Sequence, residues 1–220
     1  MKTTTSWLES VPSLDTLNLR EVQQISRNLL DRLAEDKGLL TQLVDQIPHD
    51  PERLANCRVT LLLNRLSLYQ ATDRSFEIRM NMNPRLDNQR LPHDHCYAFS
   101  TRILTGGYVH VIRRRTDDGD GPFSRTDLAP GIVTVERPGS AYTLGHLMVH
   151  QAVMEPDTVT LFVRGPRRKP LSNAVAEMMP LRDSWPTPAQ PGDEPAESRP
   201  ATLAEYALMR SYLVRRHLID

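Results

Sequence analysis

Two histidines separated by one residue are the first feature of this sequence that could carry chemistry. His93 and His95 lie in the segment HDHCYAFSTRIL, whose pattern predicts a β-strand. Side chains two residues apart on a strand point to the same face, so both imidazoles can reach one ion. Imidazole nitrogens bind a divalent metal at about 2.0–2.1 Å, and a third ligand from a distant strand would complete the site. The alternative is that the pair lies on an exposed strand.

The residues around this pair predict a β domain. Short apolar or alternating runs recur between about residues 66 and 165, separated by turns rich in glycine, proline and aspartate. Strands of this length and spacing are typical of a β-sandwich or barrel. The strand of the histidine pair and the next run, YVHVIRR, predict a hairpin with its turn at Gly106-Gly107. Strand alternation then places further side chains on the face of the histidine pair, Thr101 and Ile103 and four that could take part in chemistry. These four are Tyr97, Phe99, Tyr108 and His110.

Helical patterns precede the β region. Residues 1–65 are predicted to form a helical segment that packs on the barrel. One helix is expected to begin at Asn18, whose side chain and that of Glu21 would cap each other's backbone. A second is expected to begin at Asp50-Pro51 and to run to about Leu63.

A different pattern follows the β region. The predicted barrel ends near residue 170, and residues 171–201 are rich in proline, which predicts a flexible linker. Residues 202–220 predict a last helix, capped by Thr202 and Glu205. Its apolar stripe must dock on its own barrel or on a second subunit, so a homodimer is a possible assembly.

Composition excludes several classes of function. The chain has 220 residues, 39% of them hydrophobic, and equal numbers of basic and acidic residues, 27 each. A zero net charge argues against nonspecific nucleic-acid binding. We find no apolar run long enough to span a membrane and no signal peptide, so we expect a cytoplasmic protein with no membrane partner. Its two cysteines, Cys57 and Cys96, are expected to be free thiols.

Two segments resemble the two sequence motifs of the cupin superfamily. HDHCYAFSTRILTGG is similar to the first, in which an HxH pair precedes an apolar pair and a glycine that ends the strand. GSAYTLGHLMVHQAV is similar to the second, in which the third histidine lies near the start of a strand. The resemblance implies a mainly β fold, a cupin-type double-stranded β-helix over residues 66–170 with flanking helices. It also implies a metal ion held by His93, His95 and His150, with His146 in the turn as the alternative third ligand.

One departure from the first motif bears on the chemistry. Phe99 occupies the position of the superfamily's usual glutamate, and Asp94 has the opposite strand parity, so no carboxylate replaces it on that face. The resemblance is therefore to the three-histidine variant, similar to cysteine dioxygenase-type non-haem iron oxygenases. Three neutral imidazoles leave a divalent ion its full charge and open positions for O₂ and a chelating substrate. We expect an Fe(II)-dependent oxygenase acting on a small polar molecule, with Zn, Ni or Mn as alternative ions.

Side chains predicted on the inner face are candidates for roles beside the metal. His110 is a candidate acid or base, or a fourth ligand; the alternative is a core histidine bonded to a tyrosine. Tyr97 is a candidate proton donor, with aromatic filling of the barrel as its alternative. The candidate substrate contacts are Arg79, Phe99, Tyr108, Tyr142 and His146.

Arginine side chains raise a separate question of orientation. A barrel arginine at a position similar to Arg79 binds a substrate carboxylate in thiol dioxygenases, and guanidinium suits that contact. However, Ile78 and Met80 belong to the apolar face of this strand, which would turn Arg79 toward solvent. The basic runs 113–115 and 167–169 are expected to be solvated strand ends.

Two other classes of function fit the same residues. The first is a cupin isomerase, lyase or hydrolase that uses zinc, nickel or manganese as a Lewis acid. The second is a non-catalytic ligand-binding module, in which the metal is structural or absent. A fourth protein ligand, His146 or His110, would favour this second class because structural zinc sites are closed.

Overall fold

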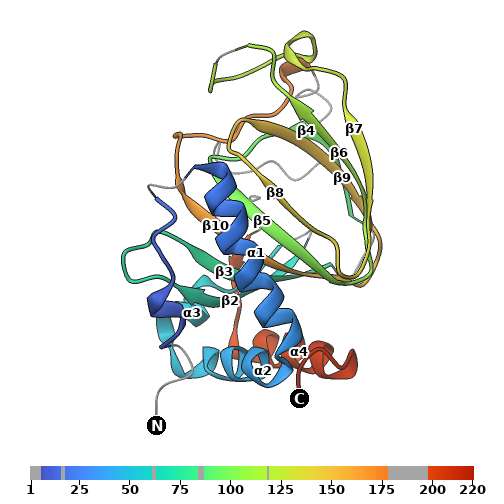
Figure 1. The fold of residues 1–220 in the computed structure, drawn as a ribbon. Coiled ribbons are helices and arrows are strands. Elements are labelled where there is room, and N and C mark those ends of the chain that lie inside the picture. Colours follow the sequence, from blue (N-terminus) through green and yellow to red (C-terminus); the bar gives the residue numbers. More distant parts are fainter. Residues whose placement is uncertain (1–5, 16–17, 61–62, 84–86, 118, 178–197) are drawn as a thin grey trace.

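The chain forms two antiparallel sheets that face each other, with helices covering one of them (Figure 1). This computed structural model describes residues 6–15, 18–60, 63–83, 87–117, 119–177 and 198–220. The helices come from the N-terminal and C-terminal parts of the chain and the strands from the middle. The predicted fold class is confirmed at the level of a mainly β protein with antiparallel sheets and flanking N-terminal and C-terminal helices.

The larger sheet has seven strands and the smaller has four. In spatial order the larger contains β11 (Arg199–Pro200), β1 (Arg58–Val59), β2 (Asn64–Gln70), β3 (Glu77–Asn83), β10 (Thr158–Arg167), β5 (Tyr97–Thr105) and β8 (Ala141–Leu144). The smaller contains β4 (Asp87–His93), β9 (Met148–Met154), β6 (Tyr108–Arg114) and β7 (Ile132–Glu136). The larger sheet therefore draws strands from both sides of the predicted 66–170 barrel range.

The described helices are α1 (Leu19–Glu35), α2 (Lys37–Asp45), α3 (Pro51–Asn56) and α4 (Leu203–Arg215), with short 3₁₀ turns at Leu8–Ser10, Ile47–His49 and Arg125–Asp127. The starts of α1, α3 and α4 agree with the prediction, whereas α2, capped by Asp36, was not predicted. Capping boxes are present at Asn18 and at Thr202, as predicted. The predicted end of the second helix at Leu63 is wrong. The chain leaves the helix at Cys57 because Arg58 and Val59 pair with strands on both sides as β1.

The main apolar core lies outside the barrel, between the larger sheet and the helices. Ile78 and Met80 of β3 are fully buried there, together with Leu30 and Leu33 of α1. Figure 1 shows α1 crossing this sheet. The apolar face of β3 therefore packs against helices, and its other face, which carries Arg79, turns toward the barrel interior. The alternative that Arg79 faces solvent is wrong, since the residue is only 8% exposed.

The last helix docks on its own chain. The Tyr206 hydroxyl donates to the carbonyl of Val44 at 3.0 Å, and the Arg210 guanidinium lies 2.6 Å from the Asp45 carboxylate. Leu213 is fully buried in the core between helices and sheet. The apolar stripe of α4 thus finds its partner in α2, and a homodimer stays a prediction.

The turn at Gly106-Gly107 joins the two sheets. The predicted hairpin is wrong, because β5 pairs with β8 and β10 whereas β6 pairs with β7 and β9. Gly106 has a φ of +70°, and a Cβ there would lie 2.5 Å from the Thr158 hydroxyl oxygen. The turn is therefore restricted to glycine by both backbone conformation and space.

The region of the predicted linker is only partly described. Residues 178–197, most of that segment, lie outside the described residues. Before it, Ala174 bridges to His93 and Val175 bridges to Phe123, and Val175 is fully buried. Within the described ranges, no helix is long and apolar enough to cross a membrane.

Shortening a buried α1 side chain tests how much this core contributes. We expect Leu30→Ala to lower the free energy of unfolding by about 2–5 kcal/mol, because it leaves a cavity between helix and sheet. Urea denaturation followed by circular dichroism measures the change. Leu208→Ala on α4 is the matched control, since Leu208 is 69% exposed and should change stability by less than about 0.5 kcal/mol. Equal losses in both variants would contradict this packing.

Candidate metal centre

The register between two strands of the smaller sheet brings His93 and His150 together. β4 and β9 pair antiparallel, with His93 directly opposite His150, and their ring centroids are 4.6 Å apart. Directly opposed residues share a face of the sheet, so both rings point into the barrel. The chain then crosses to the larger sheet, where β5 begins at Tyr97, and His95 lies in this crossing. The prediction of one strand through both histidines is therefore wrong, because the two sheets meet between them.

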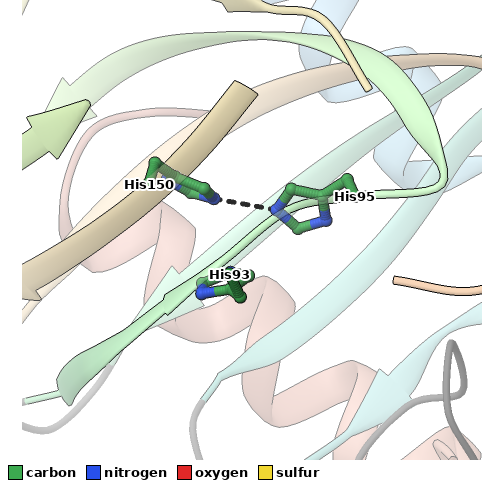
Figure 2. A group of neighbouring side chains, drawn as sticks. All are labelled: His93, His95 and His150. Atoms are coloured by element: carbon green, nitrogen blue, oxygen red, sulfur yellow. Dashed lines mark hydrogen bonds between the residues drawn. The ribbon is translucent and has the colours of Figure 1, made fainter. Parts of the chain in front are cut away.

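The three histidines converge on one point. One ring nitrogen from each of His93, His95 and His150 lies within 4.8 Å of the others, and the Nε2 atoms of His95 and His150 are 2.8 Å apart (Figure 2). Two imidazoles bound at right angles to one ion have nitrogens about 3 Å apart. The arrangement therefore fits a single ion. In the described part of the chain, the metal-binding group contains neither His110 nor His146.

All three imidazoles are prepared to act as neutral ligands. Burial lowers the pKa of His93, and burial together with neighbouring imidazoles lowers the pKa of His95 and His150 well below the usual value. Their lone pairs are therefore available at neutral pH. The Nδ1 of His93 lies 2.8 Å from the Leu91 carbonyl oxygen, to which it donates its proton. This contact leaves Nε2 of His93 for an ion.

Phe99 forms an aromatic wall beside the histidines. Its ring centroid is 4.8 Å from that of His95 and 5.6 Å from that of His150, and Phe162 stacks on its other side at 5.1 Å. Phe99 is 2% exposed. Phe99 therefore supplies an apolar surface at the position where the first sequence motif usually has a glutamate.

The candidate tyrosines form two groups around the cluster. Tyr97 stacks on His95 with centroids 5.5 Å apart. Tyr142 lies 4.7 Å from the ring of His110, and the Tyr108 hydroxyl donates to that of Tyr142. Burial raises the pKa of Tyr142 to about 12 and also raises the pKa of Tyr108 well above its usual value, so both hydroxyls keep their protons at neutral pH.

His110 lies behind His150 and away from the point where the three ligands converge. Its Nε2 is 2.9 Å from Nδ1 of His150, the nitrogen on the far side of the ring from His95. His110 is fully buried, and burial lowers its pKa to about 4. In this arrangement it contacts one of the three clustered histidines and is not itself part of the cluster.

Arg79 belongs to a charged group on the inner face of the larger sheet. Its guanidinium donates to the Glu77 carboxylate at 2.7 Å, and Arg164 donates to the same carboxylate at 2.8 Å. Burial raises the pKa of Glu77, but the two guanidinium charges outweigh this effect and hold it below its usual value. Arg79 is the cross-strand neighbour of Phe162, which stacks on the wall of the metal cluster.

His146 lies in the turn between β8 and β9 and is half-buried. Burial and the charge of Lys169 lower its pKa. Among the described residues, the group of nitrogens that could hold an ion does not include one from His146. The alternative assignment of His146 as third ligand is therefore not the one that this geometry favours.

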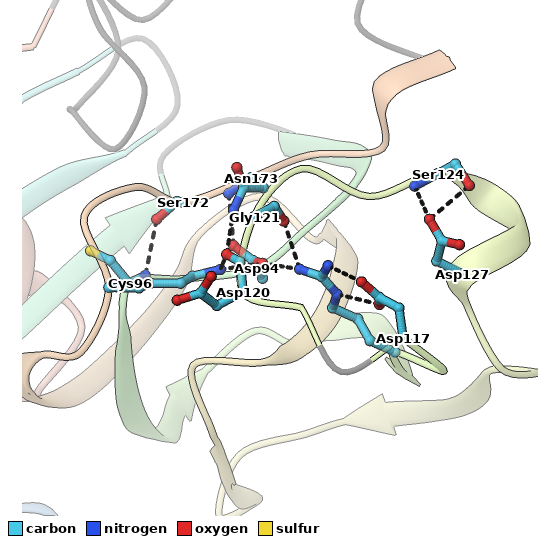
Figure 3. Close-up of polar contacts among 11 residues, drawn as sticks. Asp94, Cys96, Asp117, Asp120, Gly121, Ser124, Asp127, Ser172 and Asn173 are labelled. Atoms are coloured by element: carbon cyan, nitrogen blue, oxygen red, sulfur yellow. Dashed lines mark hydrogen bonds and ion pairs between the residues drawn. The ribbon is translucent and has the colours of Figure 1, made fainter.

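The crossing that carries His95 is held by a buried ion network (Figure 3). The Asp94 carboxylate, fully buried, accepts from the Lys169 ammonium at 2.5 Å and from the backbone N–H of Asn173 at 2.7 Å. Arg115 lies 3.7 Å from Asp94 and also pairs with Asp117. Burial raises the pKa of Asp94, and Lys169 opposes that rise.

Sequence reasoning missed this network. Lys169 and Arg115 are 3% and 5% exposed, so the expectation that both basic runs are solvated is wrong for these two residues. The sequence offered one signal for this network, the acidic residue Asp94 between two candidate metal ligands, but no local pattern points to its partner Lys169. Glu136, whose carboxylate lies 3.7 Å from Nδ1 of His110, was also missed.

Sequence comparisons identify no relative: no protein-family model matches the chain, and no curated protein does. Solved structures with some similarity include KdgF from Halomonas sp., at 19% identity and a TM-score of 0.37, covering 50% of this chain and 85% of that protein. An RmlC-like cupin from Shewanella frigidimarina has 14% identity and a TM-score of 0.36, covering 50% and 82%. Fe(II)-HppE has 7% identity and a TM-score of 0.35, covering 49% and 51%. Such slight similarity carries no argument about function.

Removing single histidines tests the ligand assignment. We expect His150→Ala to lose most of the bound metal, because it removes one of three converging nitrogens. His146→Ala should retain it, since His146 lies outside the cluster. Metal content after reconstitution and gel filtration, measured by inductively coupled plasma mass spectrometry, distinguishes the two. Loss of metal in His146→Ala alone would contradict the assignment.

Removing the buried carboxylate tests the support of the crossing. We expect Asp94→Asn to lower the free energy of unfolding by about 3–5 kcal/mol, because the Lys169 ammonium would stay buried without a counter-charge. Asp117→Asn is the control: its side chain is 33% exposed, so a loss below about 1 kcal/mol is expected. Urea denaturation of the metal-free protein measures both. A neutral effect of Asp94→Asn would show that the ion pair does not hold the crossing.

Proposed function

We propose that this protein is a mononuclear metal-dependent enzyme, an Fe(II)-dependent oxygenase that acts on a small polar molecule. The observation that carries the proposal is the convergence of three imidazole nitrogens within 4.8 Å. Imidazole suits Fe, Zn, Ni and Cu, whereas Mg, Ca and Mn prefer oxygen ligands. In the described part of the chain, no carboxylate belongs to the cluster, so a divalent ion would keep its full charge.

The ion would supply open coordination positions and one-electron chemistry, with substrate and O₂ as the reacting partners. The chain supplies the surroundings. Phe99 and Phe162 exclude water from one side of the cluster. Tyr97, whose ring stacks on that of His95, would donate a proton from its hydroxyl or orient a polar substrate.

The charge of the site favours a substrate that carries negative charge. The three imidazoles are neutral, so they do not offset the charge of a divalent ion. On the inner face of β3 and β10, the guanidinium groups of Arg79 and Arg164 lie beside the Glu77 carboxylate. A small carboxylate or another anionic chelator would be attracted by the charge of the divalent ion. His110 and the tyrosine pair line the opposite side.

Nitric oxide binding tests the oxygenase proposal without knowledge of the substrate. Anaerobic reconstitution with Fe(II) followed by nitric oxide, a stand-in for O₂, should give a spin-3/2 paramagnetic resonance signal, because three ligands leave positions open. O₂ uptake should then be measured with a panel of small thiols, diketones and hydroxy acids. Uptake should require iron and should be lost in His150→Ala.

A suitable control leaves the histidines intact. Glu155→Gln changes only an exposed carboxylate that pairs with Arg137 at 2.9 Å, and we expect it to keep the nitrosyl signal. Absence of that signal in the iron-loaded protein, together with turnover in the zinc-loaded protein and no O₂ uptake, would replace the oxygenase by a Lewis-acid enzyme. Binding of substrates without turnover of any kind would favour a ligand-binding module.

A further inference from the structure

His150 differs from the other two histidines of the cluster because both of its ring nitrogens contact another imidazole. Its Nε2 lies 2.8 Å from Nε2 of His95, on the side where the three rings converge. Its Nδ1 lies 2.9 Å from Nε2 of His110. His150 is 6% exposed and His110 is fully buried, so no solvent competes for these contacts.

Beyond His110 the contacts continue to a carboxylate. Among the described residues, Nδ1 of His110 has no hydrogen-bond partner, and Oε1 of Glu136 lies 3.7 Å away from it. The same Oε1 accepts from the Thr134 hydroxyl at 2.7 Å. Antiparallel pairing of β6 with β7 sets this geometry, because His110 is opposite Thr134 and Tyr108 is opposite Glu136. All four side chains therefore share the inner face.

The positions of the protons follow from the contacts. If Nε2 of His150 binds an ion, its only proton is on Nδ1, which then donates to Nε2 of His110. His110 must then carry its own proton on Nδ1, the nitrogen that faces Glu136. A buried N–H without an acceptor is unfavourable, and the Glu136 carboxylate is the acceptor within reach. A small rotation of the Glu136 side chain would close the remaining distance.

We propose that Glu136 and His110 form a relay that fixes the tautomer of His150 and strengthens it as a metal ligand. The chain of contacts runs from the ion through His150 and His110 to the Glu136 carboxylate, with Thr134 orienting that carboxylate. Both relay members are positioning residues, since neither touches the ion. Metal-binding histidines commonly donate their second N–H to an acceptor, and loss of such an acceptor lowers metal affinity. The relay rests on the metal site of the proposed function and is independent of the reaction performed there.

Cobalt(II) affinity of the full chain tests the relay without activity. We expect Glu136→Gln to raise the dissociation constant for cobalt about 10–100-fold, with a shift of the ligand-field absorption bands. The matched control is Glu155→Gln, the same change of charge and shape at a carboxylate that pairs with Arg137 and lies outside the relay. It should leave both affinity and spectrum unchanged. Equal effects of the two variants would overturn the relay.

A double variant distinguishes a relay through His110 from two independent structural effects of the single substitutions on metal affinity. His110→Leu should weaken cobalt binding at least as much as Glu136→Gln, and the two changes together should weaken it no further than His110→Leu alone. Members of one network are non-additive, whereas independent sites add. Additive losses would therefore overturn the proposal.

NMR of the histidine ring nitrogens in the zinc-loaded wild-type protein tests the relay without any variant, so it can be used even if His110→Leu does not fold. Long-range ¹H–¹⁵N spectra should show protons on Nδ1 of both His150 and His110. A proton on Nε2 of His110 would overturn the relay.

The outcomes distinguish failure of the metal site from failure of the relay. If the wild-type chain binds neither cobalt nor zinc, the metal site and the relay are both wrong. If it binds them and Glu136→Gln has no effect on affinity, only the relay is wrong.

Discussion

The register between β4 and β9 is the constraint on which the rest of the site depends. It places His93 directly opposite His150, and both side chains enter the barrel because opposed residues share a face. A slip of one residue in either strand would turn one of the two rings to the outer face of the sheet. His95 joins them from the crossing between sheets, so its position depends on where that crossing is held. The buried pair of Asp94 and Lys169 holds it, directly beside the ligands.

The position of the helices determines which side chains pack outside the barrel and which point into it. Because α1, α2 and α3 contact strands of the larger sheet, the outward-pointing aliphatic residues of these strands pack there, outside the barrel. The inner face carries aromatic and charged side chains, including Phe99, Phe162 and Arg79, and the interior also holds a smaller apolar cluster of Ile103, Tyr108 and Ala152. Here the stability of the fold and the chemistry of the site lie on opposite faces of the same sheet.

Burial acts on the charges of the site in two different ways. It keeps the imidazoles neutral, which prepares them as ligands, and it makes each buried charge depend on a partner. Asp94 has Lys169, Glu77 has two arginines, and Glu136 has the Thr134 hydroxyl on one side and His110 on the other. The partnered charges surround the neutral imidazole cluster at the crossing, on the larger sheet and behind His150.

The sequence by itself determined the mainly β fold class and the starts of α1, α3 and α4, because caps and strand periods are local properties of the chain. It also predicted the three clustered histidines, through spacing and through resemblance to two motifs. The tertiary structure decided which sheet each strand joins: the hairpin at Gly106 and the single strand through both histidines were wrong, since sheet pairing depends on distant partners. It alone brought Lys169 to Asp94 and Glu136 to His110, pairs 75 and 26 residues apart that no local pattern connects.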